Sequence, residues 1–198
     1  MGKIKYLTKV RDFLQKTPVA HISSLKKIVG RNSTYISLLL NSLVKRKEVY
    51  RLTKGWYAVR DDPSLAVFCF KPAYLGLQEA LSIHGLWEQE TNAIVLTTKT
   101  VREGKRMVFG APVFLQRIPK ELFFGVIYVS SGEYYLPVSD VEKTLIDMVY
   151  FAQPIDKELL KEFKKRVDKK KLNEYLKMVD AETLMRFKRV LKIHRFRT

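Results

Sequence analysis

Three carboxylates close together in the sequence are the first candidates for chemistry. Asp140 and Asp147 are seven residues apart, so they can share one face of a helix, and Glu142 lies between them. Such a group could bind a divalent cation. Alternatively, Ser139-x-x-Glu142 precedes an apolar helical run and is typical of a capping box, in which Ser139 accepts one free N–H and Glu142 reaches back to another. No His or second acidic motif completes a metal site, so the sequence favours the structural role.

Other residue types that enzymes use are isolated in this chain. The histidines His21, His84 and His194 show no ligand spacing, and the single Cys69, between two Phe residues, excludes an intramolecular disulfide. No glycine-rich phosphate loop or nucleophile elbow is present. We therefore expect no catalytic residue, no metal and no cofactor, and the chain is predicted not to be an enzyme.

A polar stripe along one predicted helix is better suited to binding. Thr34, Ser37, Asn41 and Lys45 recur at helical spacing. They lie on a different face from the apolar residues, which are Ile36, Leu39, Leu40, Leu43 and Val44. Hydroxyl and amide groups can bond base edges in a DNA groove, while Lys contacts phosphate. The stripe therefore predicts a DNA recognition helix.

The segments around this helix complete a known arrangement. A first helix is expected at 3–15, and a second begins after a Ser23 or Ser24 cap and ends at Gly30. Asn32 or Ser33 is expected to cap the recognition helix. Strands at 48–52 and 56–59 flank the turn Thr53-Lys54-Gly55 and form a hairpin. This order is typical of a winged helix-turn-helix.

Charge is distributed unevenly along the 198 residues, whose net charge is +17. Residues 1–62 carry 14 Lys and Arg against 4 Asp and Glu, a net +10, and residues 154–198 carry 15 against 7, a net +8. The middle has a net charge of −1. Excess cation on this scale favours polyanionic partners such as nucleic acid. The basic tail indicates either a solvated helix surface or a second surface for nucleic acid or an acidic partner.

Individual DNA-binding roles follow from the helical spacing and the hairpin. We expect one set of residues to recognise bases or line the groove: Ser33, Thr34, Tyr35, Ser37 and Asn41. A second set would contact phosphates: Lys45, Arg46, Arg51 and Lys54, the last at the tip of the wing. Tyr35 could instead belong to the core. The predicted partner is a double-stranded operator, with two copies of the protein on an inverted repeat.

A second domain is predicted after the polar segment at 61–64, giving domains at 1–62 and 63–198. Apolar spacing predicts a helix at 72–84 and a strand at 93–97. Further strands are expected at 107–109, 113–116, 126–129 and 134–137. A strong helix at 139–151 precedes three helical segments in 156–194. The predicted fold class is α+β, with a small sheet and a helical C-terminal tail.

The ordered motifs of the whole chain resemble the AbiEi family of antitoxins, described as transcriptional regulators of viral defence. The resemblance rests on the series GWYAV, AYLGLQEALSIHGL, AIVLTTK, FLQRIPKELFFG and LPVSDVEKTLIDMVY. The last segment is similar to the family's Ser-Pro-Glu-Lys-Thr-Leu-Leu-Asp helix start, with Asp140 in place of Pro. The resemblance implies an autorepressor and antitoxin of a type IV toxin-antitoxin system, opposing a nucleotidyltransferase toxin without requiring direct contact.

Two other classes of function remain open at this stage. One is a protein-binding module whose basic tail docks on an acidic toxin. The other is an RNA-directed activity in the second domain, with a dispersed enzyme site. No apolar run is long enough to span a bilayer and no signal peptide is recognisable, so we expect a cytoplasmic protein without a membrane partner.

Overall fold

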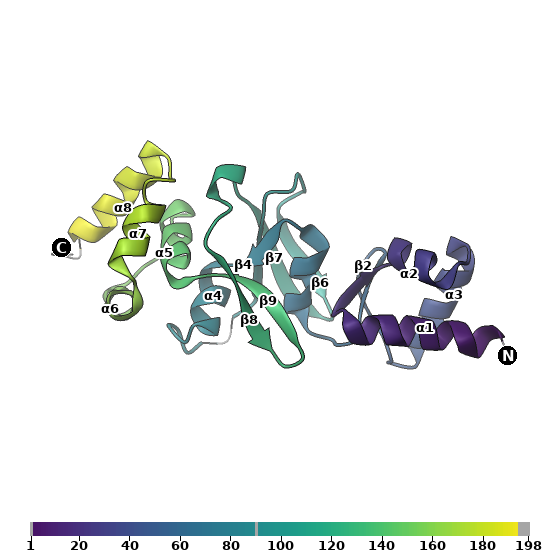
Figure 1. The fold of residues 1–198 in the computed structure, drawn as a ribbon. Coiled ribbons are helices and arrows are strands. Elements are labelled where there is room, and N and C mark those ends of the chain that lie inside the picture. Colours follow the sequence, from purple (N-terminus) through teal and green to yellow (C-terminus); the bar gives the residue numbers. More distant parts are fainter. Residues whose placement is uncertain (1, 90, 194–198) are drawn as a thin grey trace.

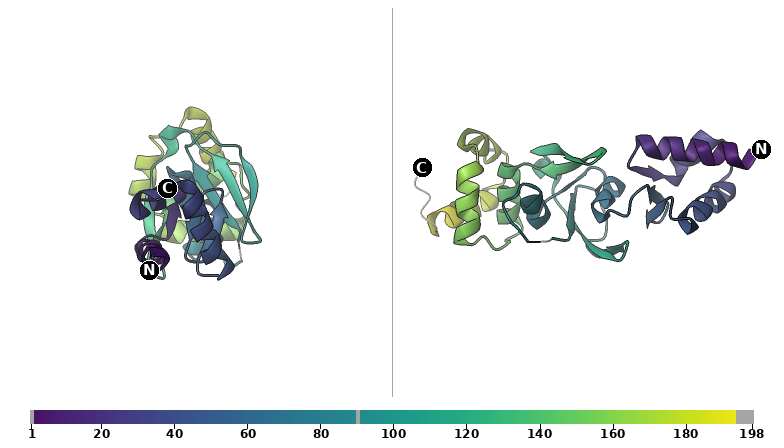
Figure 2. Two further views of the ribbon diagram at one scale, coloured as in Figure 1. Left: turned by 90° about the vertical axis from the view of Figure 1, so that its right-hand side faces the viewer. Right: turned by 90° about the horizontal axis from the view of Figure 1, so that it is seen from below.

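The computed structural model describes residues 2–89 and 91–193, which form an elongated molecule of the α+β class. A small helical unit lies at one end, a sheet occupies the middle, and a group of helices lies at the other end (Figures 1 and 2). We call residues 2–59 the N-terminal unit.

The N-terminal unit contains three helices and a three-stranded antiparallel sheet. The helices are α1 (Gly2–Lys16), α2 (Ile22–Val29) and α3 (Ser33–Lys45). The strands are β1 (Val19–His21), β2 (Tyr50–Thr53) and β3 (Trp56–Ala58), in the order β1-β3-β2. The predicted helices and hairpin are confirmed, but β1 was not predicted, since three residues are too short to show alternation.

Helix ends in this unit follow local hydrogen-bonding chemistry. The Asn32 side chain accepts the Tyr35 N–H at 2.9 Å and caps α3, as predicted. Gly30 ends α2 in the left-handed region at φ 70°. The predicted Ser23 or Ser24 cap of α2 is wrong, because His21 is the N-cap and its side chain accepts from the Ser23 N–H. The helix begins earlier because β1 runs directly into it.

The central sheet has six strands in the order β6-β7-β5-β4-β9-β8. Their bounds are β4 (Ala73–Leu75), β5 (Ala93–Thr97), β6 (Gly104–Val108), β7 (Ala111–Arg117), β8 (Val126–Ser131) and β9 (Tyr134–Ser139). The sheet is mixed, since β4 pairs antiparallel with β5 but parallel with β9, and β5 pairs parallel with β7. It is larger than the small sheet that was predicted.

The predicted helix at 72–84 is wrong in its first half. Residues Ala73–Leu75 form β4, and only Leu77–Ile83 form a helix, α4. All three residues of β4 are buried, because the strand lies between β5 and β9. An apolar run this short carries no periodicity that separates strand from helix. The 3-10 helices η1 (Pro63–Phe70) and η2 (Lys120–Leu122) were also not predicted.

Both faces of the sheet are covered. On one face, Leu75 and Val138 pack with the buried side chains of η1. On the other, Tyr74 and Leu96 pack with α4, with α5 (Val141–Tyr150) and with the C-terminal helices. These helices are α6 (Lys157–Arg166), α7 (Lys169–Tyr175) and α8 (Ala181–Ile193), as the sequence predicted.

The N-terminal unit has a core of its own but also contacts the sheet. Its core includes Val10, Leu25, Ile36 and Leu43. Leu52 and Ala58 instead belong to the hydrophobic cluster of the sheet and η1. The boundary between residues 62 and 63 stays a prediction, and it falls where Asp62 caps η1. No helix in the described ranges is long and apolar enough to cross a membrane.

Candidate nucleic-acid interface

Most residues of α3 that were predicted to contact DNA lie on its exposed face. Ser33, Thr34, Asn41 and Lys45 are exposed, and Ser37 is half-buried. The opposite face is buried in the core, with Ile36, Leu39, Leu40 and Leu43 at most 3% exposed. Helix periodicity therefore separates a packed face from a free polar face. That free face can offer hydroxyl and amide groups to a ligand together with one positive charge.

Tyr35 lies beside this face and packs on the protein. Its ring meets that of Tyr6 edge to face, with centroids 5.6 Å apart. Arg31 also contacts Tyr6, because its Nη2 donates to the Tyr6 hydroxyl at 2.6 Å and its guanidinium carbon lies 5.0 Å from the ring centroid. Of the two roles left open for Tyr35, the packing role is the one with contacts in the structure.

The hairpin turn is fixed against the start of α2. Gly55 has φ 79°, and a Cβ there would lie 2.9 Å from Nε2 of His21. The Ile22 N–H donates to the Gly55 carbonyl at 2.8 Å, and the rings of His21 and Trp56 lie 4.9 Å apart. Arg51 and Lys54 are exposed on this hairpin. Their backbone positions are thus held by packing, whereas their cationic ends are free to contact solvent or a ligand.

Arg46 has a nearby carboxylate that reduces its local charge. Glu48 accepts from Arg11 at 2.6 Å and lies 3.9 Å from Arg46. These side chains are partly exposed, so the pairs contribute little to stability. Lys45, Arg51 and Lys54 are therefore clearer phosphate candidates than Arg46.

Two residues near the predicted interface were missed. Leu38 is 65% exposed on the free face of α3, and the exposed Arg31 lies just before its cap. An apolar side chain in an apolar-rich helix is readily assigned to the core, although the spacing that selects Ile36 and Leu40 leaves Leu38 outside. The missed signal was therefore position on the helix rather than residue type.

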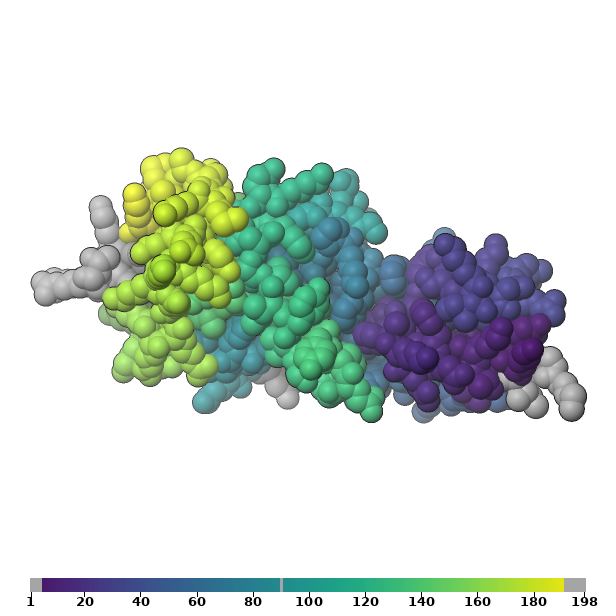
Figure 3. All heavy atoms as spheres, in the orientation of Figure 1, coloured from purple at the N-terminus to yellow at the C-terminus, as the bar shows by residue number. Residues whose placement is uncertain are grey.

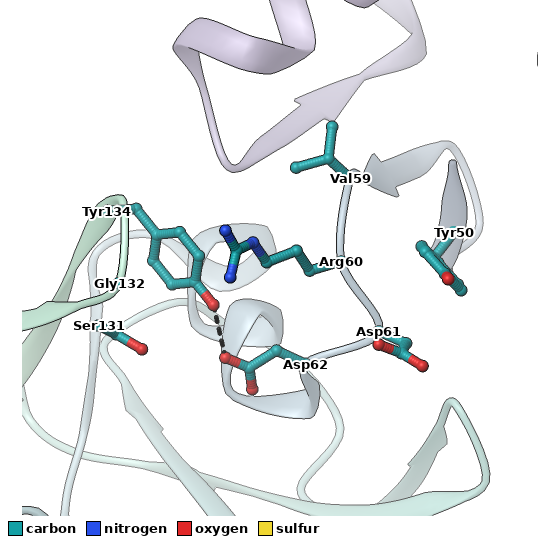
Figure 4. Close-up of a pocket in the computed structure, with 8 residues that line it drawn as sticks. All are labelled: Tyr50, Val59, Arg60, Asp61, Asp62, Ser131, Gly132 and Tyr134. Atoms are coloured by element: carbon teal, nitrogen blue, oxygen red, sulfur yellow. Dashed lines mark hydrogen bonds between the residues drawn. The ribbon is translucent and has the colours of Figure 1, made fainter. Parts of the chain in front are cut away.

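A pocket of about 570 Å³ lies where the N-terminal unit meets the rest of the chain (Figure 4). The Tyr134 hydroxyl donates to Asp62 at 2.7 Å, and Arg60 donates to Glu133 at 3.0 Å. The Arg60 guanidinium also lies 5.9 Å from the centre of the Tyr134 ring. We call these four residues the clasp. Polar groups of the clasp are bonded to one another, so these residues form a contact between the N-terminal unit and the sheet.

The three carboxylates near α5 have partners within the protein. Asp140, not Ser139, caps α5 by accepting the Lys143 N–H at 2.8 Å, so the predicted capping box is wrong. Ser139 belongs to β9 and its hydroxyl bonds to Thr144, which delays the helix start by one residue. Glu142 accepts the Asp168 N–H at 2.8 Å and does not reach back to the cap.

Asp147 lies in a fully buried ion pair. Lys143 donates to its carboxylate and the Tyr74 hydroxyl donates to it at 2.9 Å, all three side chains being inaccessible to solvent. Lys143 Nζ also lies over the rings of Tyr74 and Phe124, at 5.4 and 5.0 Å. Burial raises the pKa of Asp147, an effect that Lys143 opposes, and burial raises the pKa of Tyr74 well above its usual value. This network is a packed polar core.

The other motifs that enzymes use also have structural partners. His21 caps α2, and His84 lies 2.6 Å from the Ser139 carbonyl, whereas His194 lies outside the described residues. Within the described ranges, no three His, Cys, Asp or Glu side chains form a metal-binding group. Cys69 is buried, and that burial raises the pKa of its thiol to about 12.

The C-terminal helices present a second basic surface. Exposed cations follow the outer faces of α6 and α7, namely Lys157, Lys161, Lys164, Lys165, Arg166, Lys169 and Lys170. Leu159, Leu160 and Phe163 lie on the buried side. Figure 3 shows these helices at the opposite end of the molecule from the N-terminal unit.

The elements described place the chain in the α+β class, and comparison with known structures finds the same overall fold elsewhere. Comparisons with protein-family models and with curated protein sequences give no match. The crystal structure of the Rv2827c protein from Mycobacterium tuberculosis is similar at a TM-score of 0.62 and 14% identity. The match covers 96% of this chain and 78% of that one. At this identity the similarity establishes the fold alone.

Proposed function

We propose that the N-terminal unit is a winged helix-turn-helix and that the protein is a sequence-specific DNA-binding transcriptional regulator. The observation that carries this proposal is the free face of α3, where Thr34, Ser37 and Asn41 are directed away from the core and Lys45 follows them. Uncharged hydrogen-bonding groups can distinguish base edges in the major groove, which an all-cationic surface cannot do.

The surroundings of α3 support the same proposal. The order of α2, a turn at Gly30 and α3 supports the assignment of a helix-turn-helix. The hairpin of β2 and β3, on which Arg51 and Lys54 are exposed, supports the assignment of a wing. The first-turn N–H groups of α3 that Asn32 does not cap suit a phosphate, and the excess charge of residues 1–62 suits a polyanion. In this assignment the role of Tyr35 is to support the helix through Tyr6.

Binding to the protein's own upstream DNA tests the proposal. Fluorescence anisotropy would compare that duplex with a scrambled one at about 50 to 200 mM salt. We expect a preference for the native duplex of about a hundredfold or more that survives at the higher salt. Equal and steeply salt-sensitive binding of both would contradict sequence-specific recognition.

Asn41→Ala sharpens the test. The Asn41 amide can form two hydrogen bonds to one base edge. We therefore expect its loss to reduce the difference in binding free energy between the native and scrambled duplexes by about 1–3 kcal/mol. Asn173→Ala, which removes an exposed amide in α7, is the matched control and should leave the gap unchanged. An unchanged gap in Asn41→Ala would contradict the assignment of α3.

The resemblance to AbiEi antitoxins extends the proposal to autorepression and to antagonism of a nucleotidyltransferase toxin. Co-expression with the product of an adjacent gene tests this extension. Rescue of growth by the protein, with no stable complex on co-purification, is the expected result. Growth arrest that the protein does not relieve would contradict the antitoxin role and leave DNA binding unaffected.

A further inference from the structure

Leu38 is an apolar side chain in the centre of a polar surface. It is 65% exposed, and on α3 it lies four residues after Thr34 and three before Asn41, so all three share one face. Among the described residues that precede Met107, no other large apolar side chain is exposed. The core does not account for Leu38, because α3 already buries four apolar residues on its opposite side.

Isolated exposed apolar residues are ordinary, so the position of Leu38 carries the argument. Its neighbours on the free face are the hydroxyl of Thr34, the amide of Asn41 and the ammonium of Lys45. A protein partner with an apolar surface would have to desolvate all three. In a DNA major groove, each of these side chains has a partner. Base edges can bond the hydroxyl and the amide, phosphates can bind the ammonium, and the C5-methyl of a thymine can pack on Leu38.

We propose that Leu38 is a specificity-determining residue that packs on the methyl group of a thymine in the operator. This inference rests on the proposed function and names the base type that the centre of α3 selects. Thr34 and Asn41 supply hydrogen bonds to base edges on either side of that contact, and Lys45 contacts phosphate. The contact favours thymine over cytosine at that position, because cytosine has no C5-methyl group.

Deoxyuridine substitution tests the contact, because it removes the methyl and preserves base pairing. Each thymine of the bound upstream duplex would be replaced in turn, and affinities measured for the full-length protein and for Leu38→Ala. Leu38 is exposed, so the variant is expected to fold. Met185→Ala, which truncates a side chain that is 63% exposed in α8, is the matched control.

For the wild-type protein and Met185→Ala, deoxyuridine at one or two of the thymine positions should lower the affinity about three- to fivefold. This factor corresponds to the free energy of burying one methyl group. Leu38→Ala should bind the native duplex several-fold more weakly and lose nothing further at those positions. If the deoxyuridine losses persist in Leu38→Ala, or if no thymine matters to the wild type although it prefers the native duplex, this inference is overturned. Equal binding of native and scrambled duplexes would overturn the proposed function as well.

Discussion

At the residue scale, the charges on the hairpin and on α3 differ in what they can contribute. Lys54 lies exposed at a turn whose backbone is fixed by Gly55 and His21. A Lys at such a site can neutralise a phosphate but carries no information about sequence. Thr34 and Asn41 have the opposite properties, since they are neutral and directional. Under the proposed function, the affinity for DNA and the specificity for its sequence are therefore separable by mutation.

Lys54→Ala should weaken binding to native and scrambled duplexes about equally. Removing one phosphate contact releases about one fewer counterion, so the slope of log K against log salt should fall by about one unit. Anisotropy titrations across the salt range measure this slope. Lys120→Ala, which removes an exposed charge at the start of η2, should leave the slope unchanged. An unaltered slope and affinity in Lys54→Ala would contradict the wing assignment.

The thiol of Cys69 should be inert in the native protein. Its burial raises the pKa from 9.0 to about 12, so very little thiolate exists at pH 9, and solvent access is also blocked. Folding favours the neutral thiol over the thiolate. Burial of Cys69 therefore contributes fully to the free energy of unfolding below pH 9, and this contribution is lost as the pH rises towards 12. Labelling with a disulfide reagent at pH 9 should be slow until denaturant is added, whereas glutathione reacts at once. Native labelling at the rate of glutathione would contradict this assignment.

At the element scale, α5 depends on its buried ion pair. Lys143→Met removes one partner and leaves the Asp147 carboxylate buried without a counter-charge, so we expect a loss of about 3–5 kcal/mol in the free energy of unfolding. Chemical denaturation measures the loss. The double variant Lys143→Met/Asp147→Leu should be less destabilised than Lys143→Met, because no unpaired charge remains.

An exposed pair provides the control for α5. Lys165 and Glu162 are three residues apart on α6 and are largely solvated, so Lys165→Met should change stability little. If Lys143→Met cost no more than Lys165→Met, the buried pair would not stabilise the fold in the way we describe.

Helices whose apolar residues repeat over several turns were predictable from the sequence. The three-residue strands β1 and β4 were not. The faces of α1, α3 and α5 each repeat over several turns, and β5 has the predicted bounds. By contrast, β1 and β4 have three residues each, so their identity depends on strands far along the chain. The α5 cap shifted from Ser139 to Asp140 because β9 retains Ser139, a tertiary effect that local spacing does not contain.

The same limit applied to the candidate site. Helical spacing placed Thr34 and Asn41 on a free face, and turn chemistry placed Lys54 at the hairpin tip. The packing of Tyr35 on Tyr6 depends on a contact between residues 29 positions apart, and the clasp joins residues more than 70 positions apart. Such contacts have no local signature in one sequence.

At the scale of the whole molecule, the charge pattern of the sequence becomes a spatial one. The basic N-terminal unit and the basic C-terminal helices lie at opposite ends, with the near-neutral sheet between them (Figures 1 and 3). A polyanion bound at one end is therefore separated from the other end by the sheet. The relative orientation of the ends then depends on the contacts between the N-terminal unit and the sheet, of which the clasp is the polar part.

The clasp should restrict motion of the N-terminal unit, and trypsin provides a measure of it. Cleavage after Arg60 requires that the segment leave its bonds to Glu133 and its contact with Tyr134. Glu133→Gln/Tyr134→Phe removes a charged partner and the hydroxyl that donates to Asp62, bonds worth about 1.5 kcal/mol together in this partly exposed setting. We therefore expect cleavage at Arg60 to be about tenfold faster in the double variant, because proteolysis follows the population of the open state. Tyr128→Phe, which removes a hydroxyl from an exposed residue in β8, should be cleaved like the wild type. Equal rates in all three proteins would show that the clasp does not restrict the unit, and that apolar contacts such as those of Leu52 and Ala58 hold it in place.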